Sequence, residues 1–323
     1  MPTAPGPSAA PYVLTLGESM GLVRQTQAGR LITQRAIELG FGGAESNVAI
    51  GLSRLGTDAV WCGRLGADSV GDVIARELRA EGVRTVAIRD AGAPTGLMLK
   101  ERPTAGTSRV VYYRTGSAGS RLEPSDLSDA LIAGAALVHV TGITPALSES
   151  ADAAVESVMR RARGTGVPVS IDLNYRSALW SREAAAARLA ELVPLADIVF
   201  AGDDEAALLL GDRPLEALGG GLQALGPTEV VIKLGARGCA VFHGGTRIDH
   251  AAIPVEVVDT VGAGDAFVAG YLSELVGGAE LEQRVTTAVT AGAFACTMSG
   301  DWEGLPRRSD FASLQPNHDP VQR

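Results

Sequence analysis

Lysine and cysteine are both scarce in this chain. Of its 28 basic residues only Lys100 and Lys233 are lysines, which we attribute to composition bias and from which we infer nothing about function. The three cysteines, Cys62, Cys239 and Cys296, are odd in number and share no C-x-x-C spacing. No signal-peptide pattern opens the chain, so we expect a reducing, cytoplasmic location.

Long apolar runs and an excess of positive charge are also missing. No apolar run reaches the roughly 18 residues that a membrane-spanning helix requires. Twenty-eight basic residues against 37 acidic ones leave a net charge of −9, which argues against broad binding to nucleic acid or to an anionic membrane. A chain of 323 residues can bury roughly three-quarters of its unfolded surface, so it needs neither disulfides nor a metal to fold.

Several catalytic motifs are absent as well. The sequence contains no G-x-x-x-x-G-K-[ST] phosphate loop and no G-x-G-x-x-G turn that opens a helix. It also lacks an H-E-x-x-H metal motif and a G-x-S-x-G nucleophile elbow, which leaves zinc and serine hydrolases without support. His139 lies inside an apolar strand, where we expect it to be a core residue.

Short apolar runs alternate with amphipathic ones along most of the chain. Strands are expected at 13–16, 60–64, 136–141, 167–172, 198–201 and 230–234, and helices at 44–55, 70–81, 151–163 and 204–210. This rhythm predicts an α/β fold whose mostly parallel central sheet carries helices on both faces. Val86–Tyr113 differs, because its short polar-flanked runs fit antiparallel strands. Ligands of such sheets bind beyond the carboxyl ends of the strands.

The most informative stretch is DTVGAGDAFVAGYL, residues 259–272. A glycine-rich turn, Gly262-Ala263-Gly264, precedes a helix expected at Ala266–Leu275, so that backbone N–H groups can converge on an anion. Asp265 then lies where it could accept a proton from an attacking hydroxyl. The alternative is that Asp265 only caps the helix and the glycines form an ordinary turn.

A second stretch near the other end of the chain favours the catalytic interpretation. Gly42 and Gly43 come directly before the expected helix at 44–55, with Asn47 one turn inside. Asn is a poor helix former, but its amide is a good bidentate ligand for vicinal hydroxyls.

Together these stretches resemble the two signatures of the ribokinase-like (PfkB) carbohydrate kinases. The likeness runs in colinear order from about Tyr12 to Pro306. More narrowly, the chain is similar to 2-keto-3-deoxygluconate kinases in the motifs YYR (112–114), GSAGS (116–120), GITPALS (142–148), DLNYR (172–176) and LW (179–180).

The resemblance implies a three-layer α/β/α fold with a small β-sheet lid over the sugar. It places the kinase domain at 12–315, with lid strands from about 19–41 and 86–115. The Pro/Ala/Ser-rich composition of residues 1–11 predicts a disordered tail before it, and a second tail is expected at 316–323.

It also implies a site. Asp265 is the general base, and Gly262, Ala263 and Gly264 form the anion hole. The sugar-binding residues are Gly43, Ala44, Glu45, Ser46, Asn47, Tyr112, Arg114, Ile143, Arg176 and Asp301. The nucleotide-binding residues are Asn174, Tyr175, Arg176, Gly235, Ala236, Arg237 and Gly238, together with Gly262 and Gly264.

ATP and Mg²⁺ are the implied cofactors, with Glu205 holding the metal indirectly through water. Three positions depart from the family pattern. Gly202 replaces the usual Asn of the metal motif, Met98 stands where relatives can carry a substrate-contacting tyrosine, and Val289 where some have an adenine-side asparagine. The first departure leaves open how the metal is held, the second which sugar acid is bound (gluconate- or galactonate-derived), and the third which nucleotide is preferred.

The expected activity is ATP-dependent phosphorylation of the 6-hydroxyl of 2-keto-3-deoxygluconate. Arg114 and Arg176 near the sugar fit an anionic substrate. A kinase of a neutral sugar such as fructose or ribose, or of a nucleoside, is the alternative, and a catalytically silent sugar-binding protein on this fold is another. No nucleic-acid or membrane partner is expected, but a homo-oligomer is, as a dimer through the lid or a higher assembly.

Overall fold

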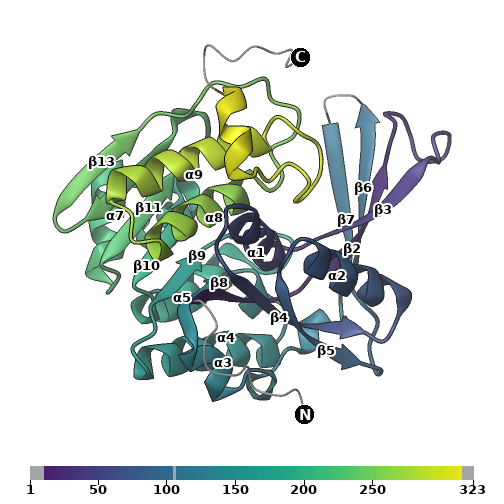
Figure 1. Ribbon diagram of the computed structural model, residues 1–323, viewed down its shortest axis with the longest axis horizontal. Coiled ribbons are helices and arrows are strands. Elements are labelled where there is room, and N and C mark those ends of the chain that lie inside the picture. Colours follow the sequence, from purple (N-terminus) through teal and green to yellow (C-terminus); the bar gives the residue numbers. More distant parts are fainter. Residues whose placement is uncertain (1–10, 105–106, 315–323) are drawn as a thin grey trace.

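A central sheet runs through the whole molecule (Figure 1). The computed structural model describes residues 11–104 and 107–314, so the tails expected at the two ends lie almost wholly outside the described residues. Within them nine strands form this sheet, in the order β13 (Thr246–His250), β12 (Cys239–His243), β11 (Glu229–Lys233), β10 (Ile198–Gly202), β9 (Val169–Asp172), β8 (Ala135–Thr141), β1 (Tyr12–Leu16), β4 (Ala59–Gly66) and β5 (Arg84–Asp90).

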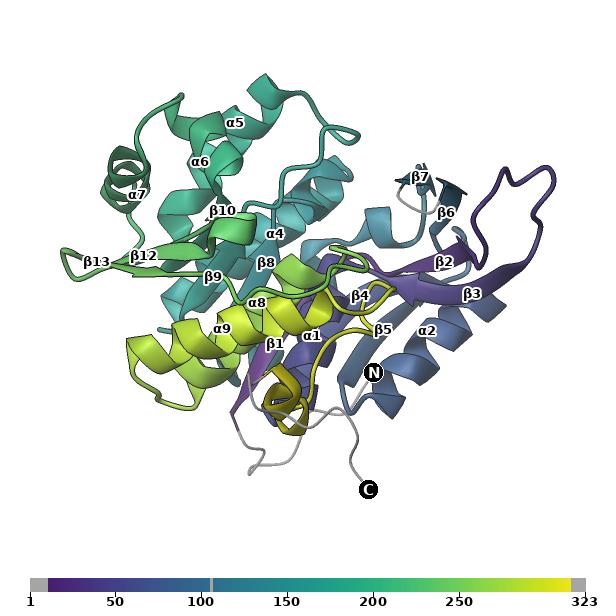
Figure 2. The same ribbon diagram turned by 90° about the horizontal axis from the view of Figure 1, so that it is seen from above.

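Most of the sheet is parallel, as predicted. Every neighbouring pair from β11 to β5 runs parallel, and only β12 and β13 extend the sheet as an antiparallel hairpin. Helices cover both faces (Figure 2). One layer contains α1 (Ala44–Arg54), α2 (Ser69–Ala80), α8 (Ala263–Val276) and α9 (Leu281–Ala295); the other contains α3 (Asp129–Ala133), α4 (Glu149–Gly164), α5 (Arg182–Leu192), α6 (Asp203–Leu210) and α7 (Leu215–Ala224).

The strand period of two divides the buried residues into two cores. On β1, Tyr12, Leu14 and Leu16 pack into the core beneath α4 and α5, while Val13, between Tyr12 and Leu14, packs into the core beneath α1 and α8. A strand buried on both faces is apolar at consecutive positions. That is why these segments read as continuous apolar runs. His139 on β8 is fully buried, as expected, and its Nδ1 lies 2.9 Å from the Ser170 hydroxyl.

A separate four-stranded sheet stands beside α2, apart from the central sheet (Figure 1). Its strands, in the order β3 (Ile37–Gly42), β2 (Met20–Gln25), β6 (Leu97–Thr104) and β7 (Thr107–Tyr113), pair antiparallel at both edges and parallel in the middle. We refer to these four strands as the lid.

The prediction of antiparallel strands throughout Val86–Tyr113 is wrong for its first part. Arg84–Asp90 forms β5, which pairs in parallel with β4 at the edge of the central sheet. The strand has a short apolar run, Val86-Ala87-Ile88, with polar residues on both sides, and this pattern is similar to that of the lid strands. Its pairing partner is set by tertiary contacts that local patterning does not encode.

Short 3₁₀ helices complete the fold, at Gly119–Arg121, Pro124–Asp126, Thr144–Ala146, Val193–Leu195, Gly235–Arg237 and Arg308–Leu314. No helix in the described part of the chain is both long and apolar enough to cross a membrane.

The packing of α8 against α9 depends on Gly270. A Cβ built there would lie 2.9 Å from the Thr287 carbonyl oxygen and from Ala288 Cα, whereas at Gly220 on α7 it would meet open space. We expect Gly270→Ala to lower the free energy of unfolding by about 1–3 kcal/mol, since backbone must move. Gly220→Ala, the matched control, should raise it by about 0.5–1 kcal/mol. Urea unfolding of both variants measures this, and an unchanged Gly270→Ala would contradict the close contact.

Candidate active site

A cavity of about 950 Å³ opens between the C-terminal edge of the central sheet and the lid. Leu22 and Met98 line it from the lid, Asp172 from the end of β9, and Gly262 from the turn before α8. Its position matches the rule that open α/β sheets bind ligands beyond the carboxyl ends of their strands.

This cavity brings together most of the predicted site residues. Its lining includes Gly43, Ala44, Glu45, Asn47, Tyr112, Arg114, Ile143, Asn174, Arg176, Glu205, Gly262, Gly264, Asp265 and Asp301. Other predicted residues do not line it: Ser46, Tyr175, Gly235, Ala236, Arg237, Gly238 and Ala263. Of the family departures, Met98 and Gly202 belong to the lining and Val289 does not.

Three helices begin at the cavity after a glycine N-cap, α1, α6 and α8, and at α6 the N–H of the cap residue Gly202 donates to the Glu205 side chain. In α2, α4 and α5 an Asp or Ser side chain caps the first turn, whereas α1 and α8 begin after Gly43 and Gly262 and have no side-chain cap. Gly262 has the left-handed φ of 76°, and a Cβ there would lie 2.1 Å from the Asp301 carbonyl oxygen. The Ala263 N–H donates to the Thr260 carbonyl at 3.3 Å, and the next two N–H groups of α8, those of Gly264 and Asp265, are left open to an anion.

Asp265 lies in the first turn of α8 and is half-buried. Desolvation and, to a smaller extent, the nearby Asp172 carboxylate raise its pKa to about 7. The Asn47 side chain opposes this by donating a hydrogen bond from Nδ2 to Asp265 Oδ2 at 2.8 Å, as do the charges of Arg176 and Lys233. A carboxylate with a pKa near neutrality is suited to accept a proton.

Asn47 does more than the sequence analysis expected, because its amide holds the base. Its Oδ1 is buried and, within residues 11–104 and 107–314, has no hydrogen-bond partner. An unpaired buried acceptor in a cavity wall is a place for a ligand donor such as a sugar hydroxyl.

Arg114 extends into the cavity from the end of the lid. Its Nε donates to Glu18 Oε2 at 2.7 Å, and its guanidinium lies 5.6 Å from the centre of the Tyr112 ring. The Ser117 hydroxyl donates to the other oxygen of Glu18. The orientation of Arg114 is thereby set by Glu18, a residue just after β1 that the sequence analysis did not assign to the site.

Two acidic side chains lie deep in the sugar-side wall. Glu45 is buried, which raises its pKa, and its Oε1 accepts hydrogen bonds from the Thr141 and Thr144 hydroxyls at 2.7 and 2.6 Å. Asp301 is half-buried, and desolvation raises its pKa to about 6. A Cβ at Gly42 would fall 2.1 Å from Asp301 Oδ2, so glycine is required at that position for the carboxylate to fit.

These features were compared with known proteins. A family model described as pfkB family carbohydrate kinase matches residues 10–308. The chain belongs to the pfkB family of carbohydrate kinases. This confirms the family and fold class that the two signatures predicted.

Curated relatives of this carbohydrate kinase are similar over nearly their whole lengths. The chain is 37% identical to a 2-dehydro-3-deoxygluconokinase of Bacillus subtilis, with 93% of this chain and 94% of the relative covered. It is 38% identical to one of Thermoproteus tenax (94% and 93% covered) and 33% identical to a 2-dehydro-3-deoxygalactonokinase of Haloferax volcanii (90% and 92%). A solved 2-dehydro-3-deoxygluconokinase of Thermotoga maritima superposes with a TM-score of 0.85 at 28% identity, with 95% of this chain and 98% of that chain covered.

Lys233 is a cavity residue of this kinase that the sequence analysis missed. It ends β11, and its Nζ donates to both oxygens of Asp172 at 2.8 and 2.6 Å. A Cβ built on Gly264 would lie 3.9 Å from the same Nζ, so the ammonium faces the turn before α8. The signal was present in the composition, since Lys233 and Lys100 are the chain's only lysines and both line the cavity.

The predicted nucleotide side lies around the ends of β9, β10 and β11. Asn174 lines the cavity and, among the described residues other than glycine, is alone in having a positive φ, at 37°. Asn tolerates this conformation better than most residues, and such strain is common at ligand sites. Gly235 and Gly238 both have positive φ in the loop after β11, while Arg237 points outward and pairs with Asp203.

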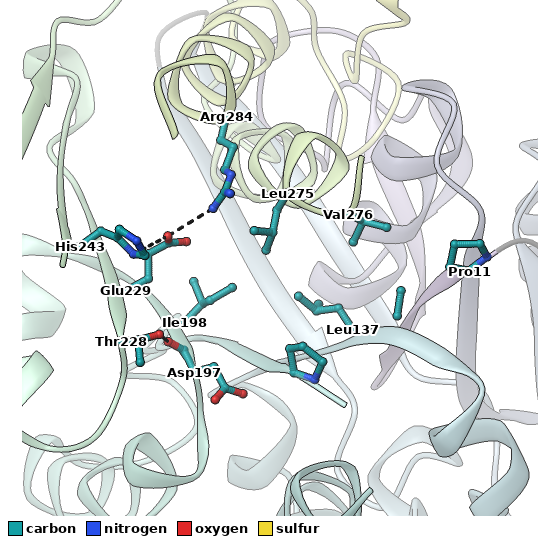
Figure 3. Close-up of a pocket in the computed structure, with 12 residues that line it drawn as sticks. Pro11, Leu137, Asp197, Ile198, Thr228, Glu229, His243, Leu275, Val276 and Arg284 are labelled. Atoms are coloured by element: carbon teal, nitrogen blue, oxygen red, sulfur yellow. Dashed lines mark hydrogen bonds and ion pairs between the residues drawn. The ribbon is translucent and has the colours of Figure 1, made fainter. Parts of the chain in front are cut away.

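A second, smaller pocket of about 420 Å³ lies at the opposite edge of the sheet (Figure 3). Glu229 at the start of β11 lies between His243 and Arg284 there, at 3.1 and 3.4 Å. It contains no residue predicted for the site, and it faces the N-terminal ends of the strands.

The pKa of Asp265 makes a prediction about pH. Because the base must be ionised, we expect kcat/KM to rise about tenfold per pH unit up to about pH 7 and then level off. Asn47→Ala removes the donor that favours ionisation, so this rise should move to higher pH. Asp265→Asn should lower kcat by about 10²–10⁴-fold at every pH. A flat wild-type profile between pH 5.5 and 8 would contradict the assignment.

A stability measurement provides the control. The folded pKa of Asp265 lies above its unfolded value, so its contribution to stability falls as pH rises from about 4 through 7. Asp265→Asn should therefore melt at a higher temperature than wild type at pH 8, and the difference should vanish near pH 4.

Proposed function

We propose that this carbohydrate kinase transfers the γ-phosphoryl group of ATP to the 6-hydroxyl of 2-keto-3-deoxygluconate, which is 2-dehydro-3-deoxygluconate under its other name. The observation that carries the proposal is a half-buried Asp265 with a raised pKa at a helix N-terminus that has no side-chain cap, in one cavity with Arg114 and Arg176. The two relatives named 2-dehydro-3-deoxygluconokinase, at 37% and 38% identity, support the same substrate class.

The residues of the chain divide the work between acceptor and phosphoryl group. Asp265 accepts the proton of the substrate's 6-hydroxyl while the hydroxyl oxygen forms a bond to the γ-phosphorus of ATP, and ADP leaves as that phosphorus–oxygen bond to the β-phosphate breaks. Asn47 keeps that carboxylate in place and ionised. The open N–H groups after Gly262 stabilise charge on the transferred group, and such fixed donors act best where water is excluded.

The cavity fits a nucleotide and a metal ion. The glycine-capped start of α8 is a cradle for phosphate oxygens that a Cβ would obstruct. ATP supplies the phosphoryl group when bound, and Mg²⁺ neutralises its phosphates. Glu205 accepts from the Tyr175 and Gly202 N–H groups at 2.9 and 2.7 Å, which leaves its carboxylate oxygens able to hold water but not free to move. An indirect, water-mediated role in metal binding suits this arrangement.

The substrate carboxylate distinguishes a sugar acid from a neutral sugar. Arg114 has its Nε and one terminal nitrogen on Glu18, which leaves the other terminal nitrogen for a ligand. A guanidinium held in this way recognises a carboxylate better than a neutral hydroxyl. Met98, in the lid wall, adds only apolar surface beside the sugar.

An ADP-release assay with Mg-ATP tests this proposal. We expect turnover of 2-keto-3-deoxygluconate or its galacto epimer and none of fructose, ribose or adenosine. Arg114→Met should raise KM for the sugar acid by about 10²-fold, as expected for the loss of a charge-assisted hydrogen bond.

Arg109→Met is the matched control, because Arg109 is exposed at the rim of the same cavity. Turnover of fructose, with a KM for fructose that Arg114→Met does not change, would establish a neutral-sugar kinase instead. Binding of the sugar acid without turnover would establish a silent sugar-binding protein.

We further propose that the enzyme is a cytoplasmic homodimer that pairs through the lid. On the lid face that points away from the cavity, Leu39, Val23 and Leu99 lie side by side on three strands. Leu39 is 53% exposed, and nearby Ile37 is 55% exposed. All three cysteines are unpaired, which suits a reducing compartment.

Light scattering tests the dimer. Leu39→Asp should convert it to a monomer, because two such charges would meet across the lid pair, while an exposed substitution leaves folding nearly unchanged. A monomeric wild type, or a dimer that tolerates Leu39→Asp, would refute the lid interface.

A further inference from the structure

Lysine is used in this chain only at the cavity. The chain has 28 basic residues, yet its two lysines, Lys100 and Lys233, both line the cavity and both form an ion pair with a carboxylate there. Lys233 ends β11 of the central sheet, in the part of the molecule outside the lid, which we call the body. Lys100 belongs to the lid, so its ion pair with Asp259 joins the lid to the body.

Lys100 lies on β6, on the lid face that points inward. Its nearest basic neighbour is Arg24, directly opposite it on β2. Lys100 is only 3% exposed, and its Nζ donates to Asp259 Oδ2 at 2.5 Å. Arg24 contacts a different part of the body, with Nη1 lying 3.6 Å from Glu303 Oε1.

Asp259 is the residue through which Lys100 reaches the phosphoryl site. Its second carboxylate oxygen, Oδ1, accepts the N–H of Val261 at 3.2 Å, one residue before Gly262. Its own N–H donates weakly to the Cys296 carbonyl at 3.3 Å. The segment before it, residues 251–258, contains no helix or strand, so the Asp259 carboxylate is a main support of this turn.

We propose that Lys100 is a positioning residue for phosphoryl transfer: from the lid, it orients Asp259 and through it the turn that begins α8. The inference rests on the proposed phosphoryl transfer. Because Lys100 is part of the lid, the arrangement of the N–H groups after Gly262 depends on the position of the lid over the cavity. A displacement of about 1 Å at such a site costs on the order of 10²-fold in rate.

Steady-state kinetics of four variants test the proposal. Lys100→Met and Asp259→Asn should each lower kcat about 10²-fold while KM for the sugar acid changes less than about threefold. The double variant should be no slower than either single one, because both singles break the same ion pair. Arg24→Met, the matched control, removes a charge from the same row of the lid without touching Asp259 and should retain most of the wild-type kcat.

The double variant also keeps the proposal testable if a single variant unfolds. A single substitution leaves the charge of Lys100 or of Asp259 buried without its partner, whereas the double substitution removes both charges. A folded double variant with wild-type kcat would overturn the proposal. So would a Lys100→Met enzyme whose KM for the sugar acid rises at unchanged kcat, since Lys100 would then be a substrate ligand. Absence of wild-type turnover on every acceptor would overturn the proposed function and this inference together.

Discussion

The contact between α1 and α8 is the constraint on which the active site depends. Gly51 on α1 allows the approach, because a Cβ there would lie 2.6 Å from the Ala269 side chain on α8. The same approach lets Asn47 reach Asp265 across 218 positions of sequence. The two signature segments therefore belong to one pair of packed helices. A larger residue at Gly51 would push α1 away from α8 and move Asn47 away from Asp265.

This arrangement places charged groups where water is largely excluded, and their pairing explains how the cavity tolerates them. Asp172 has Lys233, Glu18 has Arg114 and Asp259 has Lys100. Among the described residues Asp265 accepts a side-chain hydrogen bond from the amide of Asn47 alone, and burial raises its pKa to about 7. A sparsely paired cavity carboxylate with a raised pKa is suited to take up a proton, which agrees with the tendency of perturbed pKa values to mark functional groups.

The sequence predicted what depends on local pattern. Runs of buried residues located the parallel strands, and the glycine turn followed by a helix located Asp265. Long-range pairing could not be read in the same way. Arg84–Asp90 belongs to the central sheet because it pairs with β4, although its pattern is similar to that of the lid strands. Glu18 belongs to the site because the Arg114 side chain, 96 residues away in sequence, donates a hydrogen bond to it. The sequence shows that lysine is rare, but a functional reason for this can be inferred only from the structure, in which both lysines line one cavity.

The chemistry of lysine gives a physical reason for those two positions. A guanidinium is planar and binds best to two acceptors in its own plane, as Arg64 does with both oxygens of Asp126. An ammonium is compact and donates in three directions, so it can reach a carboxylate through a narrow approach and still face a third group. Lys233 binds Asp172 while facing Gly264, and Lys100 binds Asp259 while lining the sugar side. At both positions the compact ammonium binds one carboxylate and still faces a further part of the cavity.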